Sequence, residues 1–200
     1  MADVSAKLVK ELRDKSGAGF MECKKALVDA GGDLAAAEIA LRKRGVAIAQ
    51  KKSGRAANEG VIGSYIHAGA KLGVLVEVNC ESDFVARTDD FQQLVKDIAM
   101  QIAAADPQYI TREQVPAEIV DKERQIQRDR ALQEGKPERV VDRIVDGRMG
   151  KFYEEIVLVD QPFVKDPSAT IGSLLQTTIA KLGENMAIRR FQRFKVGEDS

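Results

Sequence analysis

The first fifty or so residues follow a helical pattern of apolar positions. Val4, Leu8 and Leu12 recur at intervals of four residues, and Gly17 and Gly19 then interrupt the pattern. Two further helical stripes follow, and they are separated by a Gly-Gly pair and by an aspartate suited to cap a helix. These stripes are formed by Cys23, Leu27 and Ala30, and by Leu34, Ala37 and Leu41. We therefore predict three short helices around a thin core.

Alternation with a period of two replaces the helical pattern in the runs 60–67 and 72–80, which flank the turn 68–71. In the second run, Leu72, Val74, Val76, Val78 and Cys80 share one face. A hairpin alone is marginal in water, so it needs a third strand or a helix packed against it. We predict that strand near the C-terminus. Its predicted buried face holds Met186, Ile188, Phe194 and Val196, and its predicted solvent face holds Arg189, Arg193 and Lys195.

Helical segments fill the remainder of the chain. Thr88 can cap a helix with a buried stripe, and Pro116 and Pro137 stand where prolines start helices well. The order of helices, two strands, helices and one strand predicts an α+β fold with a small three-stranded antiparallel sheet. We expect two domains: 1–54, a three-helix module with a linker, and 55–200, the α+β core.

Composition narrows the class of protein. The hydrophobic fraction of 44% suffices for a packed core, and no apolar run is long enough for a membrane span. The N-terminus lacks the basic and apolar pattern of a signal peptide. Cys23 and Cys80 lie far apart and form no CxxC pair, which speaks against a zinc site or a disulfide framework. These features favour a reducing, cytoplasmic location.

Charge is balanced overall but unevenly distributed. Residues 1–60 hold 12 Lys/Arg against 8 Asp/Glu, which leaves 19 against 23 for the remainder. A basic module could meet nucleic acid or an acidic protein, although an ordinary solvated surface explains so modest an excess. Lys51, Lys52 and Arg55 are the candidates for a nucleic-acid arm. No aromatic residues interleave with them, which weakens that alternative.

Known catalytic patterns are absent from the sequence. The single histidine, His67, has no nucleophile at a recognisable spacing, and no phosphate-binding loop or metal-ligand motif is present. Residues 17–19 could bind a phosphate at a helix start, but a turn between helices is the simpler interpretation. The acidic residues Glu81, Asp83, Asp89 and Asp90 could hold a cation, but capping of helix starts explains them better. We therefore expect a binding protein without a metal or cofactor.

The segment 79–87 is the most informative part of the chain. It follows the second predicted strand directly and carries one aromatic residue, Phe84, in a short polar turn. Such a turn can present the aromatic side chain as a rigid wedge. The alternative is that Phe84 folds back into the core, as a phenylalanine beside a strand usually does.

Several segments spread over nearly the whole chain together resemble the bacterial translation elongation factor Ts family, the guanine nucleotide exchange factors for elongation factor Tu. The two main signatures are Leu12 to Leu27 and Glu77 to Ala86, in which Ser16 and Ser82 replace the usual threonines and Phe20 replaces a common methionine. Further matches are Gly147-Arg148-Met149, Lys151-Phe152, Gln161-Pro162-Phe163-Val164, Leu182-Gly183-Glu184-Asn185 and Ile188-Arg189-Arg190. The departures are conservative, and only Phe20 is expected to alter docking of the first module.

The resemblance implies a fold. Family members have a ubiquitin-associated-like three-helix module, a linker, and a core with an antiparallel sheet. At 200 residues the chain looks like a short form with one core unit and no room for an inserted coiled-coil subdomain. Short members can pair, so a homodimer is expected to be possible. Ubiquitin binding by the first module is suggested by fold analogy alone.

The resemblance also implies a function and its residues. The partner would be elongation factor Tu, in its GDP-bound and nucleotide-free forms, with no direct role for nucleic acid or membrane. Ser82, Asp83, Phe84 and Val85 would disturb the Mg²⁺ site of that partner and promote GDP release so that GTP can bind. Leu12, Phe20 and Met21 would dock on its GTPase domain, and Leu182 and Gly183 would press near its phosphate-binding loop. No catalytic residue, metal site or cofactor is implied for the chain itself.

Overall fold

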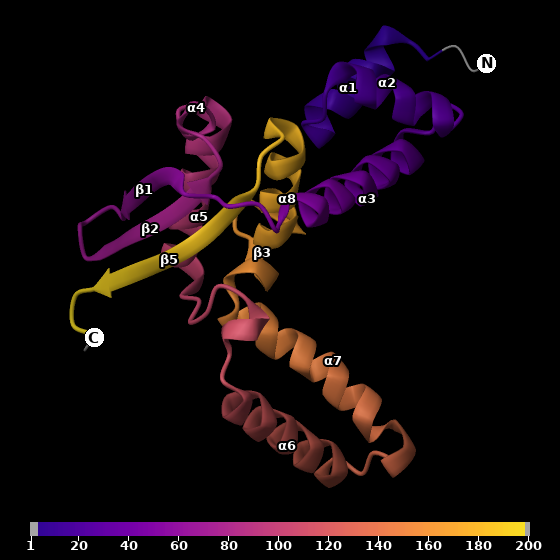
Figure 1. Ribbon diagram of the computed structural model, residues 1–200. Helices are drawn as coiled ribbons and strands as arrows, with labels where there is room; N and C mark the ends of the chain where they lie inside the picture. Colours follow the sequence, from indigo (N-terminus) through magenta and orange to yellow (C-terminus); the bar gives the residue numbers. More distant parts are fainter. Residues whose placement is uncertain (1–3, 199–200) are drawn as a thin grey trace. The chain divides into compact units, whose positions relative to one another are not determined.

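A computed structural model describes residues 4–198 (Figure 1). Helices and a small antiparallel sheet make up the fold, which confirms the predicted α+β class. The chain divides into two compact units, each formed by separate stretches of sequence. The first unit holds the residues up to Ser64, Leu75–Asp97 and Ser173–Gln192, and the second holds Tyr65–Val74, Ile98–Gly172 and the residues from Arg193.

Three N-terminal helices form where the apolar pattern predicts them. They are α1 (Ala6–Ser16), α2 (Phe20–Asp29) and α3 (Leu34–Lys52). The Ser5 hydroxyl accepts a hydrogen bond from the Leu8 amide, and the Asp33 carboxylate accepts from the amides of Ala35 and Ala36. Gly17 ends α1 with a φ of 65°, a left-handed conformation that favours glycine. The third helix extends well beyond the apolar stripe that predicts it.

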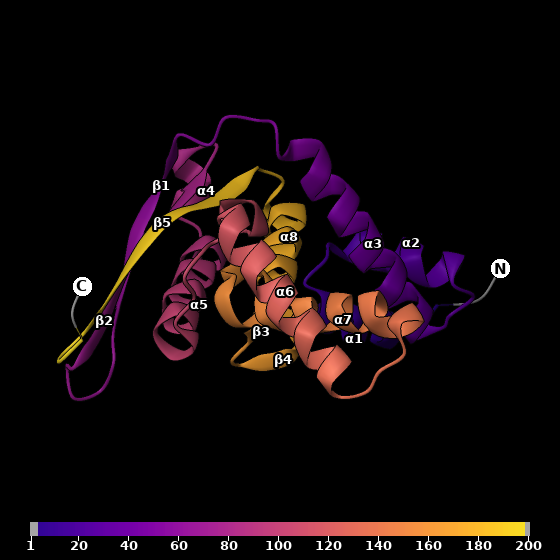
Figure 2. The ribbon, with the colours of Figure 1, turned by 90° about the horizontal axis from the view of Figure 1, so that it is seen from below.

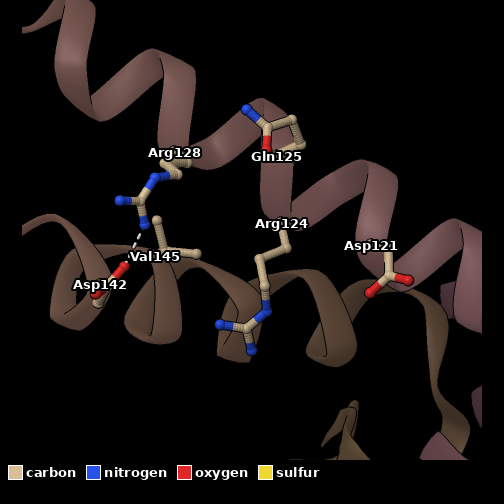
Figure 3. A pocket seen from close by; sticks show the side chains of 6 residues that line it. All are labelled: Asp121, Arg124, Gln125, Arg128, Asp142 and Val145. Carbon is tan, nitrogen blue, oxygen red and sulfur yellow. Dashed lines mark hydrogen bonds and ion pairs between the residues drawn. The ribbon is translucent and has the colours of Figure 1, made fainter.

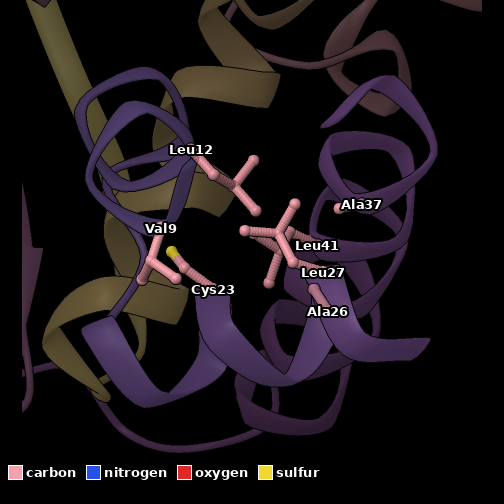
Figure 4. Close-up of a cluster of buried hydrophobic side chains, with 7 residues drawn as sticks. All are labelled: Val9, Leu12, Cys23, Ala26, Leu27, Ala37 and Leu41. Atoms are coloured by element: carbon pink, nitrogen blue, oxygen red, sulfur yellow. The ribbon is translucent and has the colours of Figure 1, made fainter. Parts of the chain in front are cut away.

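A cluster of mostly small side chains fills the space between these helices (Figure 4). Leu12 and Leu27 are fully buried at its centre, together with Cys23. Alanines on α2 and α3 complete it and let the helices approach closely. The members are Val9, Leu12, Cys23, Ala26, Leu27, Ala37 and Leu41. So small a core makes each large side chain within it important for stability.

The three-stranded sheet has the order β1-β2-β5, with β1 at Glu59–Ile66, β2 at Leu72–Cys80 and β5 at Met186–Lys195. The inward face of β2 is the predicted one, because Val74, Val76, Val78 and Cys80 are each at most 1% exposed. Gly63 in β1 lies directly against Val95 of helix α5 (Asp89–Ala105), where a Cβ atom would come within 2.2 Å of the valine Cγ1. β1 therefore packs on this helix at a point where any larger residue would force Val95 to shift.

The predicted alternation in β5 is wrong beyond Arg190. Arg189 and Arg190 are both exposed, and this pair of consecutive exposed residues shifts the alternation by one position. Phe194 and Val196, predicted to be buried, are 57% and 71% exposed. Arg193, predicted to face water, has a side chain only 14% exposed. Its burial is tolerated because its guanidinium pairs with two carboxylates, those of Asp106 at 3.4 Å and Glu198 at 3.0 Å.

The second unit contains a helical hairpin of α6 (Ala117–Gln133) and α7 (Glu138–Ile156), which lie side by side in both views (Figures 1 and 2). Pro116 and Pro137 immediately precede the two helices, as predicted. The hairpin has its own small core of Ala131, Val141, Val145 and Met149. The chain therefore holds a subdomain of paired helices at residues 117–156, and the expectation that it has no room for one is wrong.

Short elements connect the larger ones. A single helical turn, α4 (Asp83–Ala86), stands between β2 and α5, and α8 (Ile171–Leu182) precedes β5. The remaining elements are the 3-10 turns η1 (Arg112–Gln114) and η2 (Leu158–Asp160) and the paired strands β3 (Pro162–Phe163) and β4 (Asp166–Thr170). Six of the nine candidate site residues lie in α4 with its N-cap Ser82 and at the end of α8 with the turn after it, and both segments belong to the first unit.

Candidate partner-binding site

Phe84 projects from the helical turn α4 and is 79% exposed. The turn begins where the Ser82 hydroxyl accepts a hydrogen bond from the Val85 amide, at 3.4 Å. Ala86, two residues after Phe84, points inward and is 5% exposed. The alternative that Phe84 folds into the core is therefore wrong. Its exposure leaves this aromatic side chain available for contact with another molecule.

The turn that carries Phe84 is held on its C-terminal side by side-chain contacts. The Arg87 guanidinium donates to the Asp83 carboxylate at 2.8 Å. The Thr88 hydroxyl donates to the Val85 carbonyl at 2.8 Å and accepts from the Phe91 amide at 3.3 Å, so Thr88 caps α5 as predicted. These contacts hold the step from α4 into α5, so the backbone that carries Phe84 belongs to a turn with several side-chain restraints.

On its N-terminal side, the same turn is bound to the segment between α8 and β5. The Glu184 carboxylate accepts from the backbone amides of Glu81 and Ser82, at 3.1 and 3.0 Å. Its other oxygen, Oε1, accepts from the Ser82 hydroxyl at 2.6 Å. Just before the turn, Cys80 is fully buried and its thiol donates to the Ser82 carbonyl at 3.1 Å. Burial raises the pKa of the Cys80 thiol.

Glu81 makes the reverse connection. Its carboxylate accepts from the backbone amide of Asn185 at 2.6 Å and lies 3.6 Å from the Arg55 guanidinium. The Asn185 hydrogen bond, and then the Arg55 charge, hold the pKa of the Glu81 carboxyl below its ordinary value. We call Glu81 and Glu184 the crossed carboxylates, because each accepts from the backbone of the segment that carries the other.

Leu182 and Gly183 lie in the turn that these carboxylates hold. Leu182 ends α8 half-buried, and Gly183 is exposed with a φ of 77°. The Lys52 ammonium donates to the Gly183 carbonyl. The Asn185 side chain donates to the Arg55 carbonyl at 2.7 Å. The end of α3, the turn with Phe84 and the turn with Gly183 are thus joined within the first unit.

The residues expected to dock on a GTPase domain are only partly exposed. Met21 is 70% exposed and Phe20 is 47% exposed, both at the start of α2. Leu12 is fully buried in the module core, and this corrects its expected place on the docking surface. The helical repeat that places Leu12 with Leu8 on one face of α1 points that face at α2 and α3. We use the name docking surface for Phe20 and Met21 alone.

The alternatives raised by charge find little support in the geometry. Two of the three basic residues of the supposed nucleic-acid arm make intramolecular contacts, Lys52 with the Gly183 carbonyl and Arg55 with the Glu81 carboxylate. Residues 17–19 form a turn between helices. Among residues 4–198, no group of three or more His, Cys, Asp or Glu side chains is placed to hold a metal ion.

A pocket of about 350 Å³ lies between α6 and α7 in the second unit (Figure 3). Its charged lining residues are two aspartates and two arginines. Arg124 bonds to Asp146 at 2.8 Å, and Arg128 bonds to Asp142. Its lining consists of Asp121, Arg124, Gln125, Arg128, Asp142 and Val145. The contacts pair Arg124, Arg128 and Asp142 within the hairpin. Within the described part of the chain, no helix has the length and hydropathy needed to cross a membrane.

Sequence reasoning does not identify the crossed carboxylates. It interprets Glu81 as a capping residue and finds Glu184 only within a matching segment. The available signal is an acidic residue directly after a predicted strand, and another directly after Gly183. Nothing in the spacing of two residues about a hundred positions apart indicates that they meet.

Comparisons with known proteins agree with one another over nearly the whole chain. A family model described as Elongation factor TS matches residues 7–198. Elongation factor Ts of Solibacter usitatus (strain Ellin6076) is 62% identical over 198 residues, which cover 99% of this chain and 93% of that protein. Elongation factor Ts of Thermoanaerobacter sp. (strain X514) is 58% identical over 98% of this chain and 96% of its own length. That of Geobacter sulfurreducens (strain ATCC 51573 / DSM 12127 / PCA) is 58% identical over 98% and 90%.

Proposed function

Because the chain belongs to the elongation factor Ts family, we propose that it is a guanine nucleotide exchange factor for elongation factor Tu in translation elongation. It binds the GDP form of that partner, disturbs its Mg²⁺ site and promotes release of GDP so that GTP can bind. The family membership and the geometry of the turn around Phe84 both support this proposal.

The observation that carries the mechanism is the exposure of Phe84 on a short, doubly held helical turn. A mobile segment would lose backbone freedom on insertion into a partner, whereas a turn already held by hydrogen bonds has lost most of that backbone freedom before binding. Phe84 therefore acts as a wedge, with Ser82, Asp83 and Val85 shaping the turn that presents it. Insertion near the Mg²⁺ site weakens the contacts that hold GDP.

Exchange of this kind needs no covalent chemistry, so the chain acts without being an enzyme. The factor binds the nucleotide-free partner more tightly than the GDP-bound partner. Thermodynamic linkage makes the two effects equal: the factor by which the protein weakens GDP binding to the partner is the factor by which GDP weakens binding of the protein to the partner. Its contribution is therefore a difference between two affinities, and none of its residues has to carry out a bond-making step.

The docking surface supplies an anchor for the wedge. Phe20 and Met21 are apolar, exposed and adjacent, as a hydrophobic contact requires. Leu12 supports them from the core rather than by touching the partner. Leu182 and Gly183 form a third contact, near the phosphate-binding loop of the partner. Once one contact is made, the others engage at a high effective concentration.

We propose three further properties of the protein. The chain divides functionally at residues 54 and 55 into an anchoring module and a core domain. Two copies can pair. The protein works in the cytoplasm, where its proposed partner would be found.

Stopped-flow release of a fluorescent GDP from elongation factor Tu tests the proposal. The protein should accelerate release in proportion to its concentration until the partner is saturated. A folded preparation that binds a matched partner without accelerating release would contradict exchange activity while leaving the family membership intact.

A further inference from the structure

The Glu184 carboxylate uses both of its oxygens on one short stretch of another segment. One oxygen accepts from the amides of Glu81 and Ser82, at 3.1 and 3.0 Å, and the other accepts from the Ser82 hydroxyl at 2.6 Å. Hydrogen bonds to an ionised carboxylate are stronger than those between neutral groups. Three of them converge here on the two residues that lead into the turn with Phe84.

These bonds lie upstream of Phe84, where they set the direction in which the turn leaves the sheet. Ser82 already caps α4 through its bond from the Val85 amide, so helix capping alone does not require Glu184. The carboxylate instead fixes the backbone at the start of the turn relative to the segment that carries Glu184. A shift of that backbone would move the exposed aromatic ring with it.

The segment that carries Glu184 is itself held in place. The backbone amide of Asn185 donates to the Glu81 carboxylate at 2.6 Å, and this is the second of the two connections that the crossed carboxylates make. The carbonyl of Gly183, which precedes Glu184, accepts from the Lys52 ammonium. The carboxylate therefore connects two rigid turns, one with the wedge and one with the Leu182–Gly183 contact.

We infer that Glu184 is a positioning residue for nucleotide exchange, which holds the Phe84 wedge at a fixed place relative to the Leu182–Gly183 turn. The inference rests on the proposed function. Two contacts that must engage one partner together act best when their spacing is set before binding. Because a displacement of about 1 Å can cost as much as about a hundredfold in rate, loss of this bridge should be visible in the exchange reaction.

The first test is the variant Glu184→Gln. A glutamine oxygen can still accept from the two backbone amides, but its NH₂ group must donate to the Ser82 hydroxyl, which already accepts from the Val85 amide. The charge is lost as well, so the bonds that remain are the weaker bonds between neutral groups. We expect the maximal rate of GDP release at saturating concentration to fall by about tenfold. Affinity for the nucleotide-free partner should change much less, because the docking surface is untouched.

Glu77→Gln is the matched control. Glu77 is another partly buried carboxylate of the first unit, and its partner is a basic group, Arg190, at 2.7 Å. Its carboxylate contacts the side chains of Asn79 and Arg190, which are strand residues of β2 and β5. The exchange rate of this variant should equal that of the unaltered protein. An equal loss in both variants would mean that removal of any nearby carboxylate has the same effect, and would overturn the inference.

Two readouts separate positioning from a general structural role. In a Phe84→Ala background, Glu184→Gln should not lower the residual rate further, because the wedge it positions is gone. Hydrogen exchange of the Glu81 and Ser82 amides should become faster in Glu184→Gln, with the α1–α3 amides unchanged. A further loss of rate in the Phe84→Ala background, or unchanged exchange at both amides, would overturn the inference.

Two remaining outcomes are also decisive. Should Glu184→Gln fail to fold, Glu184→Asp keeps the charge but is one methylene shorter, and it should lower the maximal rate while remaining folded. An unaltered rate in that variant would count against positioning. Should the unaltered protein itself fail to accelerate GDP release, the proposed function fails, and amide exchange at Glu81 and Ser82 alone decides whether Glu184 fixes the turn.

Discussion

The Ser82 hydroxyl lies 2.6 Å from the Glu184 carboxylate, and this contact joins two segments that are 102 residues apart in the sequence. One segment presents the exposed Phe84 and the other contains Leu182 and Gly183. The contact makes two candidate contact regions parts of one structure. It holds the proposed wedge and the proposed second contact at a defined spacing.

Replacement of Phe84 by alanine should leave the fold intact. The side chain is 79% exposed, so its loss removes little buried surface, and the free energy of unfolding should change by no more than about 0.5 kcal/mol. Phe91 is the matched control, because it is fully buried and Phe91→Ala should cost about 3–5 kcal/mol. Chemical denaturation measures both. Comparable losses in the two variants would show that Phe84 packs in solution.

The residues of the first module should separate into a supporting and a contacting class. Leu12→Ala should destabilise the protein by about 2–5 kcal/mol, since it opens a cavity in a thin core. Met21→Ala removes a side chain that is 70% exposed, so it should weaken partner binding with little change in unfolding. Denaturation and titration with the nucleotide-free partner give the two quantities. Unweakened binding by Met21→Ala would remove this residue from the contacting class.

Glu81 should make part of the stability depend on pH. Its folded pKa lies below the ordinary value of 4.5, chiefly because the Asn185 amide donates to its charged form and also because of Arg55. The resulting stabilisation is present above pH 4.5 and is lost as the pH falls through the lowered folded pKa. The stability difference between the unaltered protein and Glu81→Gln should therefore be constant near neutral pH and shrink in acid. A difference that stays constant into acid would contradict this.

Gly183→Ala should destabilise the turn next to Glu184. The φ of 77° lies in the left-handed region, where a Cβ atom costs about 1–2 kcal/mol even though the space around Gly183 is open. Gly147→Ala is the control, because Gly147 is exposed within α7 and also has open space. There alanine should stabilise the helix by about 0.5–1 kcal/mol. Thermal unfolding of the two variants should thus shift in opposite directions, and equal shifts would refute the assignment of strain.

Local elements are well predicted from the sequence, because helical and alternating apolar patterns are read over short distances. The three N-terminal helices, the hairpin strands and the proline-started helices all follow from such patterns. The second half of β5 is predicted wrongly, since two consecutive exposed arginines shift the alternation there. That shift depends on partners for Arg193 which lie elsewhere in the chain.

The candidate site is predictable only in part. Phe84 can be identified because one aromatic residue stands in a polar turn directly after a strand. Resemblance places Leu12 on the surface, although the packing of α1 on its neighbours buries it. The crossed carboxylates escape prediction because two acidic residues that meet through the fold leave no short-range pattern. Contacts of that kind require the three-dimensional structure.

The most direct test of the proposed mechanism compares the unaltered protein with Phe84→Ala in the release of a fluorescent GDP from elongation factor Tu, at concentrations that saturate the partner. We predict strong acceleration by the unaltered protein. We predict much slower release with Phe84→Ala, which should still fold and still bind the nucleotide-free partner through its docking surface. Equal acceleration by both proteins would contradict the central claim that the exposed Phe84 side chain is the group that drives exchange.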